Sequence, residues 1–295
     1  MASIRLLRGR IKSVKNIAQI TKAMEMVAAS KMKKAQAQAL SGKLYAQKIF
    51  DMVMELGEKS DSRHHPLLTK PAQTTGRRLI LLLSTNKGLC GSLNTNLLRF
   101  FLETYPNVNA HDYVSIGKKG ANLLVRMGGS LIADFSQSNT FVETVPALAD
   151  LAVSGYLSYK YDGVDLVWNE FFSALKQHPV KKTILPLTMA FEQTKSTAQN
   201  HEFLIEPTIS EVFDRLLPHY IENQIRDAIL QAEASEHSAR MIAMRNATDN
   251  ARSRIDDLTL MYNKARQEKI TYEISDMITA RMTISDMITA RMTMS

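Results

Sequence analysis

The chain has 295 residues, 45% of them hydrophobic and 22% charged, which is ordinary for a globular protein with a sizeable core. Its single cysteine, Cys90, excludes an internal disulfide and fits a reducing compartment. The longest apolar run, Leu79 to Leu83, is too short to cross a bilayer, and we expect no secretory signal because the N-terminus lacks a compact apolar block.

The net charge of +8 is concentrated at the start of the chain. Residues 1–59 carry twelve Lys and Arg against four acidic residues, so this segment alone has the excess of the whole chain. This local excess of positive charge predicts an acidic partner, which would be nucleic acid, anionic lipid or an acidic protein surface.

Residues 1–59 are predicted to form the N-terminal helix of a coiled coil. Asn16 to Ala39 contains no Pro or Gly and is rich in Ala, Met, Lys and Gln, which favour helix. Apolar or small residues recur at steps of three and four. We place the seam on Ile4, Leu7, Ile11, Val14, Ile17, Ile20, Met24, Val27, Ala28, Met32, Ala35, Ala39, Gly42, Ala46, Ile49, Val53 and Leu56. The short step from Val14 to Ile17 predicts a local irregularity in the winding.

The middle of the chain, residues 77–206, is predicted to be an inserted Rossmann-like α/β domain. "RRLILLLST" and "GVDLVWNEFF" are typical of strands, and "DYVSIG", "SLIADF" and "KKTILPLTMAF" are weaker strand candidates. Helices are predicted at "NTNLLRFFLETYP", "KKGANLLVRMG" and "VETVPALADLAVSGYLSYKY". Alternating strands and helices indicate a parallel sheet.

The loop "STNKGLCGSLN", Ser84 to Asn94, lies where an α/β layer can bind phosphate on backbone N–H groups. The chain contains neither a P-loop nor a dinucleotide-binding glycine pattern, so a structural turn is favoured over a nucleotide site. The alternative is an α/β enzyme that uses this loop. The histidines show no metal-ligand spacing and no nucleophile motif occurs, so we expect no catalytic, cofactor or metal residues.

Residues 208–295 are predicted to form the C-terminal helix of the coiled coil. Pro207 and nearby acidic residues mark its start, and Pro218 is expected to kink it or to end a short first piece. The predicted seam comprises Ile225, Ala228, Ala232, Ser235, Ala239, Ile242, Ile255, Leu258, Tyr262 and Ala265, with polar interruptions at Asn246 and Asp249. Two such seams at opposite ends of the chain predict an antiparallel pair. The fold class is therefore α/β, with a long antiparallel coiled coil and an inserted Rossmann-like domain.

The two predicted helices differ in length. At about 1.5 Å per residue the first spans roughly 80 Å, whereas the last extends beyond roughly 100 Å. The overhang has apolar residues without a partner in the chain, which predicts a covering protein. These residues are Ile270, Ile274, Met277, Ile278 and Met282. The sequence "ISDMITARMT" occurs at 274–283 and again at 284–293, a duplication whose second copy is rotated by roughly 80° on a helix.

Three stretches resemble the gamma subunit of the bacterial F-type ATP synthase, in the family's order and over nearly the whole chain. They are "IKSVKNIAQITKAMEMVAASKMKKAQ", "LLLSTNKGLCGSLN" and "ASEHSARMIAMRNATDN…YNKARQEKITYEI". The resemblance implies a non-catalytic central stalk that turns inside a hexamer of alpha and beta subunits. It also implies contacts with the epsilon subunit and the membrane c-ring, coupling of proton flow to ATP synthesis, and regulation of ATPase activity.

The resemblance further implies a peripheral position on the cytoplasmic face of the bacterial inner membrane and a central domain that binds no nucleotide. It assigns contacts with the alpha and beta subunits to Lys22, Met24, Lys31, Lys33, Lys34, Arg266, Gln267, Thr271 and Glu273, and a packing or partner role to Arg240. One departure is that Met277–Arg281 lacks the Gly-Ala pair usual in the family. The alternative function is a basic coiled-coil protein that binds nucleic acid, although aromatic residues are not interleaved with its basic ones.

Overall fold

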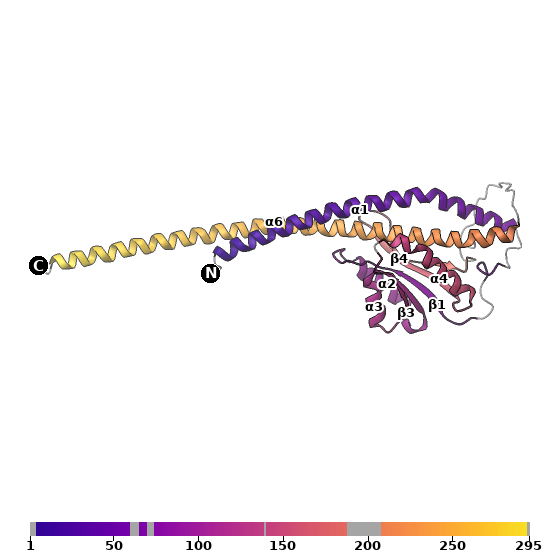
Figure 1. The fold of residues 1–295 in the computed structure, drawn as a ribbon. Helices are drawn as coiled ribbons and strands as arrows, with labels where there is room; N and C mark the ends of the chain where they lie inside the picture. The colour runs from indigo at the N-terminus through magenta and orange to yellow at the C-terminus, as the bar shows by residue number, and fades with distance from the viewer. Residues whose placement is uncertain (1–3, 60–64, 70–73, 139, 188–207, 294–295) are drawn as a thin grey trace. The chain divides into compact units, whose positions relative to one another are not determined.

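The computed structural model describes residues 4–59, 65–69, 74–138, 140–187 and 208–293. The chain forms two compact units, whose helices and strands are labelled in Figure 1. Residues 1–25 and 244–295 make up the first, which we call the coiled-coil unit, and residues 26–243 make up the second, which we call the sheet unit. Two long helices, α1 (Ile4–Lys59) and α6 (Ile209–Thr293), contribute to both units.

Helix α6 runs for 85 residues and includes Pro218. The expectation that Pro218 ends a short first piece is therefore wrong. A proline in a helix interior removes one backbone hydrogen bond and clashes with the preceding turn. Here Phe213, Leu217 and Ile221 lie on either side of the proline and are buried in the core, and the burial of their side chains offsets that cost.

In the coiled-coil unit, buried or partly buried residues recur along both α1 and α6 at alternating steps of three and four. On α1 these residues are Ile4, Leu7, Ile11, Val14, Ala18, Thr21 and Glu25, and on α6 they are Met244, Thr248, Ala251, Ile255, Leu258, Tyr262 and Ala265. This is the uninterrupted heptad spacing of a coiled coil. The hydroxyls of Thr21 and Thr248 form a buried hydrogen bond of 2.8 Å across the seam, between residues 227 positions apart.

The predicted seam of α1 is wrong between Val14 and Ala28. Ile17, Ile20, Met24 and Val27 are exposed, and the winding irregularity expected after Val14 is absent from the described helix. The heptad continues instead through Ala18, Thr21 and Glu25, because α6 offers Thr248 and Ala251 there and small residues allow close approach. On α6, Asn246 and Asp249 likewise point to solvent rather than interrupting the seam, which passes through Met244 and Thr248.

The sheet unit contains five strands in the order β3-β2-β1-β4-β5. The strands are β1 (Arg78–Leu83), β2 (Asp112–Ile116), β3 (Ser130–Asp134), β4 (Gly163–Phe171) and β5 (Gln177–Leu185). The first four pair in parallel, but β5 is antiparallel to β4, which corrects the all-parallel prediction. Only five residues separate β4 from β5, and such a connection permits a hairpin but not the crossover that a parallel pair requires.

Helices cover both faces of this sheet. They are α2 (Leu93–Thr104), α3 (Lys118–Arg126) and α4 (Val145–Leu157), with short 3₁₀ turns at η2 (Val108–Ala110) and η3 (Phe141–Thr144). Because side chains alternate along a strand, Ile80 and Leu82 of β1 join one core with α2 and α3. Leu79, Leu81 and Leu83 join a larger core on the other face, which also includes α4 and α6. The helix α6 is thus a layer of the sheet unit.

A buried carboxylate, Asp165 of β4, ties three strands and a helix end together. Arg78 of β1 donates two hydrogen bonds of 2.7 Å to it, Thr183 of β5 donates one of 2.7 Å, and the Tyr105 hydroxyl donates one of 2.6 Å. Burial by itself would raise the pKa of Asp165, but these partners hold that pKa below its usual value. The carboxylate is therefore charged and fully bonded inside the sheet unit.

Replacing Asp165 with alanine should destabilise the chain by about 3–5 kcal/mol, because Arg78 would be left half-buried without its anion. The free energy of unfolding, measured with urea, checks this expectation. The matched control is Asp150→Ala at an exposed site on α4, for which we expect a change within about 0.5 kcal/mol. Equal effects of the two substitutions would contradict the role given to Asp165.

Candidate functional site

Side chains of α6 bind the backbone at the ends of the sheet in a regular series. Ser235 donates to the carbonyl of Asn169 at 2.9 Å, and Ser238 donates to the carbonyl of Ala174 at 2.6 Å. One turn earlier, Gln231 accepts a hydrogen bond of 3.3 Å from the indole of Trp168. Steps of four and three residues place these side chains on one face of the helix. This face holds β4 and the hairpin that follows it against α6.

Arg240 continues this series toward a different loop. Its guanidinium donates to the carbonyl of Gly88 at 3.3 Å and to that of Lys87 at 3.2 Å, and it forms an ion pair of 2.6 Å with Glu236. The side chain is only 11% exposed. The structure therefore places Arg240 in an internal contact, and sequence analysis could not predict the bond because 152 residues separate Arg240 from Gly88.

The Ser84–Asn94 loop uses its polar groups within the chain. The first backbone N–H groups of α3 donate to Asn86 at 3.0 Å, to the carbonyl of Thr85 at 3.2 Å and to the hydroxyl of Ser84 at 2.7 Å. These are the groups that would bind a phosphate at a helix N-terminus. A Cβ at Gly117, in front of α3, would lie 2.1 Å from the carbonyl oxygen of Ser84. The N-terminus of α3 thus has its first backbone donors satisfied by side chains and carbonyls of the same chain.

The lysines that were assigned to partner contacts on α1 are exposed. Lys31, Lys33 and Lys34 all reach solvent. Two of them also act on α6: burial and the charge of Glu236 raise the pKa of Glu233, and Lys31 and Lys34 oppose that rise. Part of the positive field of α1 is therefore matched by acidic residues of the same chain.

In the coiled-coil unit, α1 presents a second apolar face outside the seam. Ile17, Ile20 and Met24 are exposed there at 52%, 60% and 37%. We call these three residues the α1 stripe. Lys22 lies among them and pairs with Glu25 at 3.0 Å. Sequence analysis missed this stripe because it placed the same residues in the seam.

The C-terminal residues assigned to partner contacts lie on a fully exposed part of α6. Every residue from Arg266 to Met282 is exposed, including Gln267 and Thr271. Glu273 pairs with Lys269 at 3.4 Å on the helix surface. The predicted overhang residues are exposed as well: Ile270, Ile274, Met277, Ile278 and Met282. This segment presents apolar side chains that nothing in the described part of the chain covers.

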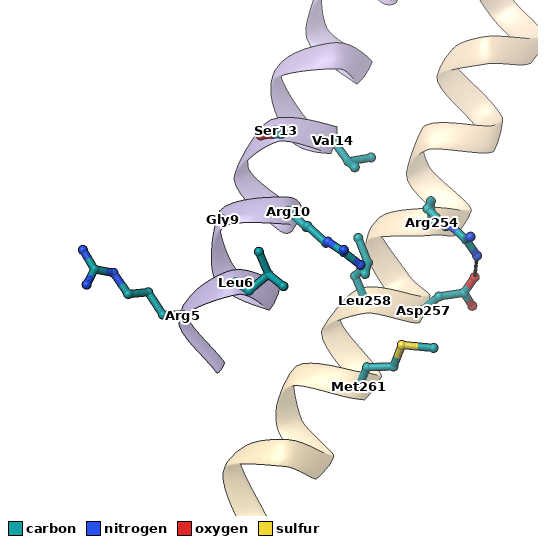
Figure 2. A pocket seen from close by; sticks show the side chains of 10 residues that line it. All are labelled: Arg5, Leu6, Gly9, Arg10, Ser13, Val14, Arg254, Asp257, Leu258 and Met261. Atoms are coloured by element: carbon teal, nitrogen blue, oxygen red, sulfur yellow. Dashed lines mark ion pairs between the residues drawn. The ribbon is translucent and has the colours of Figure 1, made fainter. Parts of the chain in front are cut away.

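A groove lies between the two helices of the coiled-coil unit (Figure 2). Leu6 and Arg10 point from α1 toward Leu258 of α6, while Arg5 points away from it. Arg254 pairs with Asp257 at 3.6 Å along the opposite rim. Apolar side chains and three arginines line the groove together with Asp257, and sequence analysis did not single it out.

Comparison with known proteins identifies the family of this chain. The ATP synthase family model matches residues 3–283. The ATP synthase gamma chain of Herpetosiphon aurantiacus is 42% identical over 291 residues, which cover 94% of this chain and 97% of that protein. That of Methylacidiphilum infernorum is 42% identical over 294 residues, covering 95% and 99%. The chain belongs to the ATP synthase gamma chain family.

Solved structures agree with this gamma chain assignment. A chain in the central stalk and c-ring structure of the Tetrahymena thermophila mitochondrial ATP synthase is 27% identical, with a TM-score of 0.57 over 77% of this chain and 99% of that one. A chain of the Euglena gracilis mitochondrial ATP synthase has a TM-score of 0.64 over 96% and 94% at 19% identity, a likeness of fold.

Two further features of this gamma chain are the polarity of its helices and the length of its C-terminal helix. Over the residues that were placed, no helix combines the length and the apolar character needed to cross a membrane. The family match ends at Thr283, where the first copy of "ISDMITARMT" ends, whereas α6 continues through the second copy to Thr293.

The stability of this gamma chain should depend on pH through His237. Burial lowers the pKa of His237, and the charges of Arg240 and Lys31 lower it further, to about 4. The unfolded chain, with an ordinary histidine pKa of about 6.5, binds the proton first, so the free energy of unfolding falls as pH drops through this window.

Urea titrations between about pH 5 and pH 7 check this dependence in a window above the ordinary carboxylate pKa values. His237→Gln should flatten the slope of the free energy of unfolding against pH. Part of the slope should remain in this variant, because burial also lowers the pKa of His111. A slope that His237→Gln leaves unchanged would contradict the assignment.

Proposed function

We propose that this chain is the central-stalk rotor subunit of an F-type ATP synthase. In this role it has no catalytic residues of its own, couples proton flow through the membrane ring to ATP synthesis at the beta subunits, and regulates ATPase activity. The observation that carries the proposal is the exposed segment Arg266–Met282, which leaves several large apolar side chains uncovered on a chain of the gamma family. Apolar side chains that gather on an exposed surface mark contact with another protein.

The proposed partners are the alpha and beta subunits around the coiled-coil unit and the exposed lysines Lys31, Lys33 and Lys34 of α1, and the epsilon subunit and the c-ring at the five-stranded sheet. The chain would then lie peripherally on the cytoplasmic face of the bacterial inner membrane. The α1 stripe and the exposed overhang offer apolar contact at two places on the coiled-coil unit. Lys22, Met24, Arg266, Gln267, Thr271 and Glu273 are proposed contacts with these partners, and all six are exposed.

A turning shaft needs stiffness and a weak, renewable attraction to its surroundings. Two helices joined by an uninterrupted heptad seam supply the stiffness. The attraction is proposed to come from Lys31, Lys33 and Lys34, whose hydrated charges sit on flexible stems. Exposed ion pairs are worth about 0–1 kcal/mol each, so they break and form again during rotation at little cost. Arg240 is bound inside the chain, which favours packing over partner contact.

The nucleic-acid alternative shares only the positive charge of α1. No observation on the sheet unit or the coiled-coil unit favours this alternative.

Co-purification from the native membrane fraction tests the proposed function. An affinity tag on the chain should recover alpha and beta subunits in a three-to-three ratio, together with ATPase activity that the chain lacks alone. Recovery of the chain without these subunits, or with nucleic acid instead, would refute the proposal.

Neutralising Lys31, Lys33 and Lys34 together with glutamine should lower proton-driven ATP synthesis roughly tenfold, since three exposed ion pairs of up to about 1 kcal/mol each are lost. The amount of assembled complex, measured by co-purification, should change little. The matched control is Lys118→Gln with Lys119→Gln, two exposed lysines on α3 of the sheet unit. Normal synthesis in the triple variant would argue against the electrostatic role.

A further inference from the structure

We propose that Arg240 is a positioning residue: it straps α6 to the Ser84–Asn94 loop and sets the conformation in which that loop presents Leu89 to solvent. Three groups define the strap, namely the Arg240 guanidinium, the Glu236 carboxylate and the carbonyl oxygens of Lys87 and Gly88.

The geometry of the guanidinium suits this task. Nε and Nη2 both donate to the carbonyl of Gly88 at 3.3 Å, and Nη2 also reaches the carbonyl of Lys87 at 3.2 Å. Glu236, one turn earlier on α6, holds Nη2 at 2.6 Å, and Nη1 donates to Nδ1 of His237 at 3.4 Å. A planar fork bound at each of its nitrogens cannot rotate freely. The loop is therefore fixed to α6 in one orientation.

The loop needs such a fixed point because its backbone is strained. Leu89 has a φ of +61°, a left-handed conformation that residues other than glycine rarely adopt. Its side chain is 62% exposed, so burial of the leucine does not compensate for the strain. The carbonyls that Arg240 binds belong to the two residues immediately before Leu89. Contacts from outside the loop therefore stabilise the strained turn.

The same stretch of α6 also binds a second segment of the sheet unit. Ser235 and Ser238 bind the end of β4 and the hairpin after it, and Arg240 binds the loop after β1. Two separate loops at the end of the sheet are thereby fixed to one stretch of helix. A consequence that rests on the proposed function is that Leu89 would turn with α6 as a fixed contact point of the rotor.

The chain carries its own reporter of this loop. Cys90 is the only cysteine, it is buried, and its Sγ accepts a hydrogen bond of 3.2 Å from Asn94. Burial raises the pKa of Cys90, and the positive charge of Arg240 opposes that rise. Removing Arg240 would therefore raise the thiol pKa and reduce the thiolate fraction. Faster reaction of the thiol in such a variant would report access to the loop, because the electrostatic effect has the opposite sign.

The experiment measures the rate at which dithionitrobenzoate modifies Cys90 in the purified full chain. In Arg240→Gln we expect a rate increase of at least about tenfold, as expected from losing hydrogen bonds to a charged group. Arg226→Gln, at an exposed position of the same helix, should leave the rate unchanged. Arg240→Lys should fall between them, because one ammonium group keeps the charge but lacks the fork that reaches both carbonyls.

An unchanged rate in folded Arg240→Gln would overturn the proposal. If that variant does not fold, as judged by circular dichroism, the proposal is tested with Glu236→Gln instead. This substitution leaves Arg240 without its orienting carboxylate. Amide hydrogen exchange is then measured across the 86–91 loop, because it is independent of thiol ionisation. Faster exchange in the loop with unchanged exchange in β1 supports the strap, and equal exchange overturns it. Both readouts use the isolated chain, so they stand or fall separately from the rotor function.

Discussion

The rest of the structure depends on how α6 packs in the sheet unit, through buried apolar residues and a series of hydrogen bonds. Leu217, Ile221 and Ile225 are almost fully buried in the large core, where they meet β1, β4 and α4. The same stretch of helix is followed by the polar series Gln231, Ser235 and Ser238, which satisfies backbone and indole groups at the ends of the strands. Hydrophobic burial holds the helix to the sheet, and hydrogen bonds at the rim specify where along the sheet it lies. A helix inserted this way can tolerate Pro218.

The coiled-coil unit follows a different rule, since each helix there buries one narrow face and leaves the rest free. Its seam includes a Thr21–Thr248 hydrogen bond between small polar residues where larger apolar ones are available next to them. The apolar side chains displaced from the seam form the α1 stripe. The unit therefore has more apolar surface than its own packing uses. The α1 stripe lies on a helix with a strong basic excess, a combination suited to an acidic and partly apolar partner.

Periodicity predicted the elements well and their partners less well. The buried run Leu79 to Leu83, the two long helices and the exposed overhang follow directly from apolar spacing, because that spacing reflects burial in one local element. Between Val14 and Ala28, two heptad registers fit the sequence, and the larger side chains of Ile17 and Ile20 favoured the wrong one. The register through Ala18 and Thr21 is set by Thr248 and Ala251 of α6, which the local sequence of α1 cannot reveal. The antiparallel β5 was foreseeable from its short connection, whereas the contacts of Arg240 join residues too distant for any pattern.

Pairing the two chain ends has a consequence in time. Thr21 bonds to Thr248, which lies 227 residues later in the chain. At about 5–20 residues per second, the ribosome therefore adds Thr248 roughly 11–45 s after Thr21. During that interval the heptad face of the nascent N-terminal helix has nothing of its own to pack against. A newly made chain is therefore most vulnerable to aggregation before about its last sixth emerges, and chaperones that shield apolar helices would act in that interval.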